Sequence, residues 1–360
     1  MIQRLDNKLL LTPKSFKPSD ARLRVIGVFN PGVMRFEDKI IMLARVAETA
    51  AEEKPGLVSS PRALYTNHQH KIEIDYYPAA PDQHDPRRVF TDRGLERLPF
   101  VSHLRLIRLN EDGYNVESVE RLDELMPHNE NEVYGIEDAR ITRIGDTFYV
   151  AYVSVSDKIG ISTSLMSTTD FKQFTRHGVI FDLETKDVVL FPEKFEGRYA
   201  AFIRPMSKTG LHRTTILATF SPDLIHWGEY RYLMNSPQSG WNAHRIGMGC
   251  PPLKTKLGWL SVYHGVEKVG GGPAGRYCAG AILTALDNPT RIIGQSSEPF
   301  FEPTESFEKN GFVSNVVFPT GIVQDHLNPD KVLIYYGCAD TSVGVVTFAL
   351  PDIINSLEKV

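Results

Sequence analysis

Two adjacent carboxylates and an arginine share one short motif, Gly135-Ile136-Glu137-Asp138-Ala139-Arg140. A carboxyl group held beside a cation is a common arrangement for general acid–base catalysis. Successive side chains of an extended strand face opposite sides. We therefore expect one of the two carboxylates to face a ligand while the other pairs with Arg140. The alternative interpretation is a turn with a structural ion pair.

Polar residues also stand at the ends of several short apolar strands predicted along the chain. These end residues are Arg45, Tyr152, Arg204, His264 and, just beyond its strand, Asp340. A single arginine after an apolar strand is usually a solvated loop residue, but the same feature in several strands indicates a common site. Such a site would suit an anionic or polyhydroxyl ligand, because arginine binds oxyanions through two parallel hydrogen bonds.

Two turn-rich segments offer further polar groups. Residues 29–33 contain Asn30, whose side-chain amide can bind hydroxyl groups, and residues 241–252 hold Arg245 among glycines and prolines. Glycine allows the backbone to approach a ligand closely. Either segment alone is more often a structural loop.

Several other chemistries are disfavoured. No P-loop or dinucleotide-binding glycine pattern occurs, and the glycine run at 270–272 is expected to be a flexible loop because no Lys-Ser/Thr pair follows it. No GxSxG or HExxH motif occurs either. His68 and His70 allow a metal pair, but a polar loop is the preferred interpretation. We expect no metal and no cofactor.

The elements that must position these residues are short strands. Runs of β-branched and aromatic residues recur between Gly, Asp, Asn and Pro, and helical periodicity is scarce. Five of these predicted strands share a form, at 38–45, 145–152, 197–204, 258–264 and 330–337. No linker divides residues 1–360, so we expect one all-β domain. A β-propeller of about five blades, with its innermost strands ending at the mouth of a central channel, is favoured over a β-sandwich.

Composition limits the partners and the compartment. The 360 residues carry a formal net charge of −4, which argues against nucleic acid as a partner. No apolar run reaches the length of a membrane span. Three widely spaced cysteines and a first segment without a signal-peptide pattern indicate a cytoplasmic protein. The oligomeric state stays open, with a homo-oligomer among the alternatives.

At these residues the chain resembles the mannoside phosphorylases and mannosidases of glycoside hydrolase family 130. The resemblance runs in order through nearly the whole chain. It covers residues 29–32, 135–140, 186–194, 203–205, 245–249, 263–266, 315–319 and 335–340. It implies a five-bladed β-propeller with its active site at the mouth of the central channel and an activity on β-linked mannosides. Within the family, the chain most resembles the oligomannan phosphorylases.

The resemblance also implies roles for individual residues. Asp138 corresponds to the proton donor, which in this family acts through a sugar hydroxyl. The phosphate-binding residues would be Lys186, Arg204, Arg245 and His264, and the mannosyl-binding residues would be Asn30, Arg45 and Asp340. Two positions depart from the usual pattern, since Arg245 replaces a lysine and Lys186 replaces an arginine. Both keep the positive charge but change the geometry of phosphate binding.

The leading hypothesis is an inverting phosphorolysis that converts a β-mannoside and inorganic phosphate, the co-substrate, into α-mannose 1-phosphate. A phosphorylase needs cations for phosphate, whereas an inverting hydrolase needs a second carboxylate as base. The alternatives are an inverting β-mannosidase, with Glu267 as the base, and a non-catalytic sugar-binding propeller. The β-1,2 linkage is weakly favoured, and the acceptor sugar and chain-length preference stay open.

Overall fold

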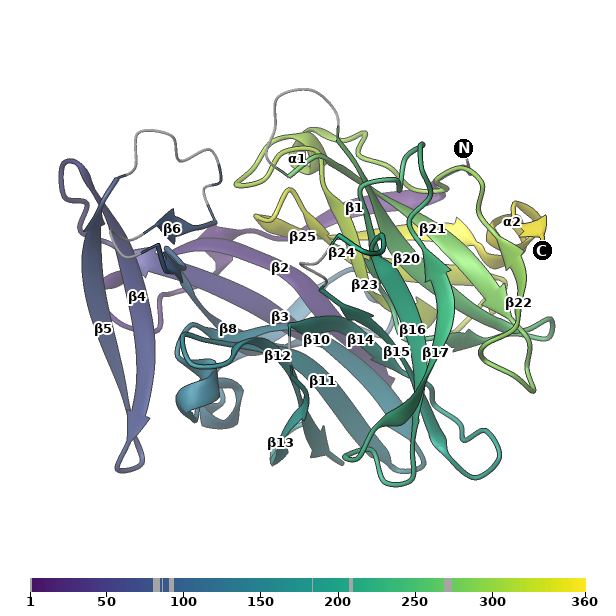
Figure 1. Cartoon of the computed structure of the whole chain (residues 1–360), viewed down its shortest axis with the longest axis horizontal. Coiled ribbons are helices and arrows are strands. Elements are labelled where there is room, and N and C mark those ends of the chain that lie inside the picture. Colours follow the sequence, from purple (N-terminus) through teal and green to yellow (C-terminus); the bar gives the residue numbers. More distant parts are fainter. Residues whose placement is uncertain are drawn as a thin grey trace.

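The structure is a computed structural model, and most of it consists of β-strands (Figure 1). It describes residues 2–79, 85, 87–90, 94–182, 184–206, 210–268 and 274–360. The glycine run at 270–272 lies outside these residues. Among the described residues the two α-helices are short, α1 (Ser306–Lys309) and α2 (Leu350–Asn355). The all-β class expected from the sequence is confirmed.

Most of these strands belong to antiparallel units of four. The first unit contains β2 (Leu23–Phe36), β3 (Lys39–Ala50), β8 (Val101–Leu109) and β9 (Val116–Glu120). The second contains β10 (Gly135–Ile144), β11 (Thr147–Ser156), β12 (Gly160–Thr168) and β13 (Thr175–Phe181). One parallel pairing, between Gly135 and Ser102, joins these two units into a continuous sheet.

Three further units follow along the chain. The third contains β14 (Thr185–Leu190), β15 (Tyr199–Pro205), β16 (Thr215–Ser221) and β17 (Gly228–Asn235). The fourth contains β18 (Arg245–Met248), β20 (Trp259–Glu267), β21 (Arg276–Thr284) and β22 (Ile292–Gln295). The last contains β23 (Val317–Gln324), β24 (Lys331–Cys338), β25 (Ser342–Ala349) and the N-terminal strand β1 (Asp6–Leu11). Pairing of β1 with β25 places the N-terminal strand in the last unit, whereas the C-terminal strand β26 (Glu358–Lys359) pairs with β22 of the fourth unit.

Smaller elements decorate these units. Two hairpins lie between β3 and β8, and the longer one stands at the left end of the molecule in Figure 1. They consist of β4 (Leu57–Thr66) with β5 (Gln69–Pro78), and of β6 (Val89–Phe90) with β7 (Glu96–Arg97). The remaining short elements are η1 (Pro13–Ser15), η2 (Asp123–Leu125), η3 (Glu130–Glu132), β19 (Leu253–Lys254) and β26 (Glu358–Lys359).

The five strands predicted from their common form are present as β3, β11, β15, β20 and β24, but their expected position is wrong. Each is the second strand of its unit rather than the innermost one. Most first strands contact the first strands of the neighbouring units, as β2 does with β10 and β23, and β14 does with β10 and β18, whereas β23 meets the fourth unit at β20 and β21. Both kinds of strand are apolar, so composition alone does not separate the first strand from the second.

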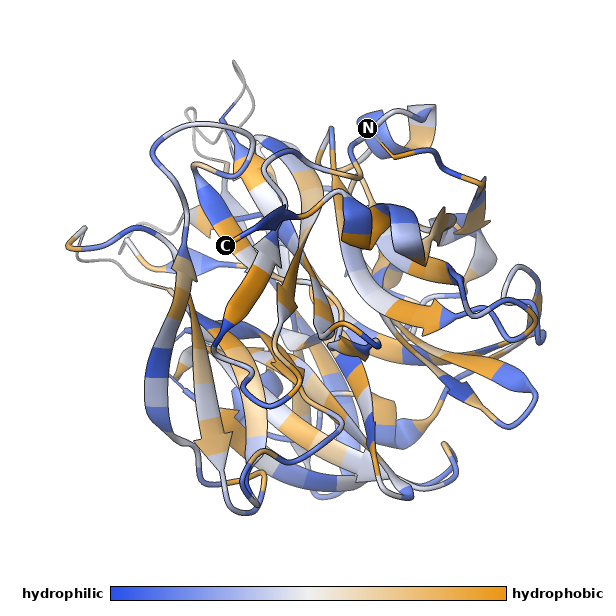
Figure 2. Ribbon diagram, turned by 90° about the vertical axis from the view of Figure 1, so that its right-hand side faces the viewer, coloured by the Kyte–Doolittle hydropathy of each residue, from blue (hydrophilic) through white to orange (hydrophobic). Residues whose placement is uncertain are grey.

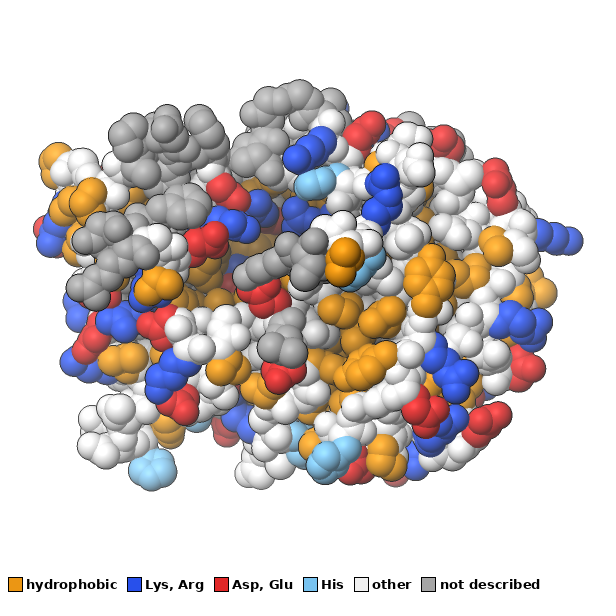
Figure 3. Space-filling view, viewed as in Figure 1, with side chains coloured by type: hydrophobic (Ala, Val, Ile, Leu, Met, Phe, Trp, Pro, Cys, Tyr) orange, Lys and Arg blue, Asp and Glu red, His pale blue; other side chains and the backbone are white. Residues whose placement is uncertain are grey.

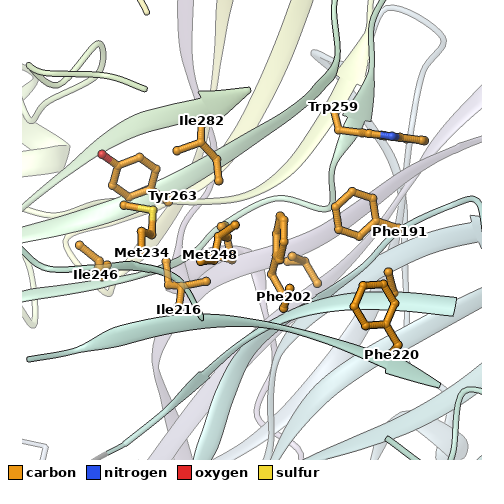
Figure 4. Packing of buried hydrophobic residues seen from close by; sticks show 14 of the residues in the cluster. Phe191, Phe202, Ile216, Phe220, Met234, Ile246, Met248, Trp259, Tyr263 and Ile282 are labelled. Carbon is orange, nitrogen blue, oxygen red and sulfur yellow. The ribbon is translucent and has the colours of Figure 1, made fainter. Parts of the chain in front are cut away.

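Apolar side chains fill the space between the units. Hydrophobic positions follow the strands and hydrophilic positions the turns (Figure 2). The outer face carries acidic and basic side chains intermixed (Figure 3). Between the third and fourth units, Phe191, Phe202 and Trp259 pack in one cluster (Figure 4). Burying each such side chain contributes about 1.5–3 kcal/mol, which fixes the units against each other.

Irregularities in three of the first strands place polar residues at the centre of the molecule. The pairing register shifts after Phe29 in β2, after Glu137 in β10 and after Lys186 in β14. The next residue in each strand, Asn30, Asp138 or Asp187, has a φ of 50°, 50° or 55°. Asn and Asp tolerate this left-handed conformation better than other non-glycine residues. Each bulge therefore turns a polar side chain out of the regular alternation.

Within the described part of the chain, no helix is long and apolar enough to cross a lipid bilayer.

Candidate active site

A pocket of about 580 Å³ collects the residues singled out from the sequence. Its wall contains Asn30, Arg45, Asp138, Lys186, Arg204, Arg245, His264 and Asp340. These eight residues come from all five units or from the turns beside them. Basic and acidic side chains also meet around a hollow beside β6 in the space-filling view (Figure 3). The fold thus brings these eight residues together.

One guanidinium joins the two adjacent carboxylates of β10. Arg45 donates a hydrogen bond of 2.7 Å from Nη2 to Oε1 of Glu137, and one of 3.1 Å from Nη1 to Oδ1 of Asp138. The expectation that the two carboxylates face opposite sides is therefore wrong, because the bulge at Asp138 breaks the alternation. Arg140 does not pair with Glu137; its Nη2 lies 3.9 Å from Oδ1 of Asp187.

Arg45 itself is held on several sides. Its Nε donates to the hydroxyl of Ser102 at 3.1 Å, and that hydroxyl donates to Glu137 at 3.0 Å. The aromatic rings of Phe29 and Phe100 lie 4.5 and 5.5 Å from the guanidinium carbon. A cation buried between rings and carboxylates cannot reorient freely. Arg45 is thus a fixed anchor for both acids.

The two carboxylates differ in acidity. Burial raises the pKa of Glu137, and the neighbouring charge of Asp138 raises it further, against the opposing effect of Arg45. Burial also opposes ionisation of Asp138, but Arg45, Lys186 and a hydrogen bond from Asn30 lower its pKa below the ordinary value. Of the pair, Asp138 is the stronger acid.

The opposite side of the pocket is organised by a third buried carboxylate. Arg204 donates from Nε and Nη2 to Oδ2 of Asp187, at 2.9 and 2.7 Å. Nε2 of His264 lies 3.8 Å from the same oxygen. Burial opposes the ionisation of Asp187, but Arg204 and the other surrounding cations hold its pKa well below the usual range. Asp187 therefore fixes the orientation of Arg204 and lies close to His264.

His264 is a neutral imidazole in this environment. Burial lowers its pKa to about 3, against the attraction of Asp187. Its ring packs on Phe318, with 4.5 Å between ring centroids. Gly247 permits this arrangement, because a Cβ there would lie 2.2 Å from Oδ2 of Asp187 and 2.5 Å from Cε1 of His264. The buried Nδ1 of His264 has no hydrogen-bond partner among the described residues.

Two further cations are less committed to protein partners. Nζ of Lys186 lies 3.9 Å from Oδ2 of Asp138, beyond hydrogen-bond distance. Arg245 begins β18 and is partly buried at the pocket wall. Its pocket neighbours Lys186, Arg204 and His264 complete a basic group that can bind an anion.

Asn30 and Asp340 lie near the carboxylate pair. Nδ2 of Asn30 donates to Oδ1 of Asp138 at 3.0 Å. Asp340 has a φ of 48° in the turn after β24. Burial raises the pKa of Asp340, while Arg87 and Arg45 oppose that effect. Asp340 is thus a carboxylate whose oxygens can accept hydrogen bonds from a polyhydroxyl ligand.

Two residues considered from the sequence lie elsewhere. Tyr152, at the end of a predicted strand, is buried and donates to Glu132 at 2.9 Å. Glu267, considered as a hydrolytic base, accepts a hydrogen bond of 3.0 Å from Arg276 and lines a different pocket. The structure therefore does not support Glu267 as a base for chemistry at Asp138.

Asp187 is the main site residue to which the sequence assigned no role. It follows Lys186 directly and lies in residues 186–194, one of the segments that carry the family resemblance. The sequence does contain a signal for Asp187, because an Asp inside an otherwise apolar strand is unusual. Asn30 and Asp138 are similar short polar residues within strands. Ser102, which connects Arg45 to Glu137, gave no such signal because a serine in a strand is common.

A family model described as "Glyco_hydro_130: beta-1,4-mannooligosaccharide phosphorylase" matches residues 103–359. A beta-1,2-mannobiose phosphorylase of Listeria innocua is 36% identical over 99% of this chain and 98% of its own length. A 1,2-beta-oligomannan phosphorylase of Thermoanaerobacter sp. is 34% identical over 68% of this chain and 78% of its own.

Structural comparison agrees with the sequence comparison. The beta-1,2-mannobiose phosphorylase of Listeria innocua, solved in complex with beta-1,2-mannobiose, superposes with a TM-score of 0.85. The alignment covers 97% of this chain and 96% of the other, at 35% identity.

Proposed function

The chain belongs to glycoside hydrolase family 130, and we propose that it cleaves β-1,2-linked mannosides by phosphorolysis with inversion, giving α-mannose 1-phosphate. The observation that carries this proposal is the basic group of Lys186, Arg204, Arg245 and His264 in the same pocket as Asp138. Phosphate is itself a nucleophile, so such a site needs cations to bind it rather than a base to activate water.

Each member of the basic group has a distinct part in binding phosphate. Arg204, oriented by Asp187, offers its remaining N–H groups in a fixed plane. Lys186 and Arg245 supply positive charge, and the neutral His264 donates a hydrogen bond. Charge-assisted contacts of this kind contribute about 1.5–3 kcal/mol each.

In the reaction, a phosphate oxygen attacks the anomeric carbon while the bond from that carbon to the leaving sugar's oxygen breaks. Attack from the face opposite the leaving group converts the β-mannoside into the α-phosphate. The leaving oxygen takes up a proton that Asp138 supplies, through a sugar hydroxyl, and the proton of hydrogen phosphate restores the carboxyl group. Charges and protons balance without a further co-reactant.

Besides acting as the nucleophile, bound phosphate changes the pKa of Asp138. With only the protein's charges present, Arg45 and Lys186 favour the ionised carboxylate. A bound phosphate dianion near Lys186 offsets part of this positive charge and raises the pKa of Asp138. We infer that phosphate binding prepares Asp138 to act as a proton donor.

The sugar-binding residues divide by their contacts. Asn30 and Arg45 both donate to Oδ1 of Asp138, so they orient the acid as well as border the sugar. Asp340 is the carboxylate we assign to a mannosyl hydroxyl. Aromatic side chains in the same wall, among them Phe100 and Phe312, provide apolar faces on which a sugar ring can pack.

The contacts between the sheet units bear on the domain organisation. Each of the five four-stranded units contacts the next, and the last, which β1 completes, contacts the first through β23 and β2; this arrangement supports a single five-bladed β-propeller over residues 1–360. The pocket would then be the mouth of the central channel. Three buried free cysteines, at 250, 278 and 338, support a reducing compartment such as the cytoplasm.

The proposal is tested by incubating the protein with β-1,2-mannobiose, with and without inorganic phosphate. We expect α-mannose 1-phosphate and mannose in equal amounts, and only with phosphate. Two molecules of mannose per cleavage without phosphate would indicate a hydrolase. No turnover under either condition, with sugar binding retained, would indicate a sugar-binding protein.

A further inference from the structure

Two histidines and an aspartate meet away from the pocket. His70 lies on β5, Asp123 begins η2, and His128 lies between η2 and η3. Oδ1 of Asp123 is 2.8 Å from Nε2 of His70, and its Oδ2 is 3.5 Å from Nε2 of His128. One ligand atom of each residue lies within 4.8 Å of those of the other two. None of the three lines the active-site pocket.

Surrounding contacts fix both imidazoles. The ring of Tyr65 lies 4.8 Å from that of His70 and 4.6 Å from that of His128, measured between centroids. Nδ1 of His128 is 2.7 Å from the carbonyl oxygen of Met126. Donation to that carbonyl requires the proton on Nδ1, which leaves the lone pair of Nε2 directed at Asp123. Metal-binding histidines commonly have their second nitrogen held in this way.

His70 adds a second indication. Its Nδ1 is buried and has no hydrogen-bond partner in the described part of the chain. Its Nε2 faces Asp123 alone. His70 is therefore directed through Nε2 at the same carboxylate as His128, which is the arrangement that a shared ligand requires.

We propose that His70, Asp123 and His128 bind one divalent transition-metal ion of the Zn²⁺ class. Two imidazoles and one carboxylate are a common three-residue set for Zn²⁺, with water in the fourth position. Bonds of about 2.0–2.1 Å place tetrahedral ligand atoms about 3.3 Å apart. The two imidazole nitrogens lie 2.8 and 3.5 Å from the two oxygens of Asp123, and all three ligand atoms lie within 4.8 Å of one another. Asp123 is 68% exposed, so its side chain can adjust and its outer side admits water.

The ion would link two separate parts of the chain. His70 belongs to the β4–β5 hairpin, whereas Asp123 and His128 belong to the segment between β9 and β10. Residues 87–98, which follow the hairpin, contribute Arg87, Leu95 and Arg97 to the pocket wall. The site is therefore structural, and it fixes the hairpin that precedes one wall of the pocket. Of the two histidines considered from the sequence, His70 belongs to the cluster, whereas His68 is exposed and outside it.

Zinc binding to the full-length protein tests this proposal. Chelator-treated protein in a phosphate-free buffer is titrated with ZnCl₂ by calorimetry, and the metal retained after desalting is measured by mass spectrometry. We expect one Zn²⁺ per chain and a higher Tm with zinc. His70→Ala, His128→Ala and Asp123→Asn should each weaken binding at least about tenfold and abolish the rise in Tm.

His68→Ala is the matched control, because it removes a histidine from the same hairpin without touching the cluster. It should bind zinc as the unmodified protein does. Asp123→Asn keeps the size of an exposed side chain, so it remains informative if a histidine variant fails to fold. The absence of stoichiometric binding by the unmodified protein would overturn the proposal and leave a hydrogen-bonded His–Asp–His bridge. Unchanged binding by all three cluster variants would overturn it as well.

Discussion

Arg204 and Asp187 form a buried pair in which two guanidinium nitrogens donate to a single carboxylate oxygen, at 2.9 and 2.7 Å. Both side chains are nearly inaccessible to solvent. Asp187 holds this position because a bulge in β14 gives it a left-handed backbone conformation. The proposed phosphate-binding group thus depends on a residue that we do not expect to contact phosphate.

Asp187→Asn should weaken phosphate binding through Arg204. The amide keeps the size of the carboxylate but removes the charge that orients the guanidinium. Loss of one charge-assisted contact of about 1.5–3 kcal/mol predicts a roughly tenfold to hundredfold higher KM for phosphate. The KM for β-1,2-mannobiose should change much less. Asp287→Asn, at an exposed carboxylate, is the control. Equal losses for both substrates would contradict a role confined to phosphate.

Asp138→Asn should lower kcat by roughly 10²–10⁴-fold, the usual contribution of general acid catalysis. Circular dichroism and the thermal transition should show a folded protein. Glu137→Gln should lose less activity, because Glu137 accepts from Ser102 and Arg45 and positions the latter. Near-normal turnover of folded Asp138→Asn, together with an inactive Glu137→Gln, would transfer the acid role to Glu137.

Gly247→Ala should disturb the phosphate side of the pocket. The added Cβ would lie 2.2 Å from Oδ2 of Asp187 and 2.5 Å from the ring of His264, so these groups must move. Overpacking of this kind costs about 1–3 kcal/mol, and we expect a lower Tm and a higher KM for phosphate. Gly228→Ala is the control, because its Cβ would meet no atom within 4 Å. Kinetics of Gly247→Ala identical to those of the control would contradict the tight packing.

The neutral state of His264 predicts a pH-dependent stability. Burial lowers its pKa to about 3 in the folded protein, whereas an unfolded histidine has a pKa of about 6.5. Between these values the unfolded chain binds a proton that the folded protein does not. Stability therefore falls as the pH decreases below 6.5, by up to about 1.4 kcal/mol per pH unit from this group.

His264→Gln removes that contribution. The difference in unfolding free energy between the unmodified protein and the variant, measured in urea at pH 7, 6 and 5, should shrink as the pH decreases. A difference that stays constant over this range would show that His264 is not held neutral by the fold.

Sequence reasoning singled out residues that line one pocket, but it did not predict their geometry. Strand-end residues such as Arg204 and His264 were recognisable because a polar group after an apolar strand is conspicuous. The relation between Glu137 and Asp138 was not predictable from strand alternation, because the bulge depends on pairing with β11. The meeting of His70 with Asp123 was hidden for a similar reason, since 53 residues separate them and only the fold joins them.

The central claim is that the basic group binds phosphate, and Arg245→Ala tests it most directly. Arg245 lies in the pocket wall and is not one of the two residues, Asn30 and Arg45, that donate hydrogen bonds to Asp138, so its removal should leave Asp138 in place. Arg291→Ala, at an exposed arginine, is the control. The measurement is the KM for phosphate against the KM for β-1,2-mannobiose in each variant. We predict a roughly tenfold to hundredfold increase for phosphate alone; an equal increase for both substrates, or full turnover without phosphate, would contradict the account.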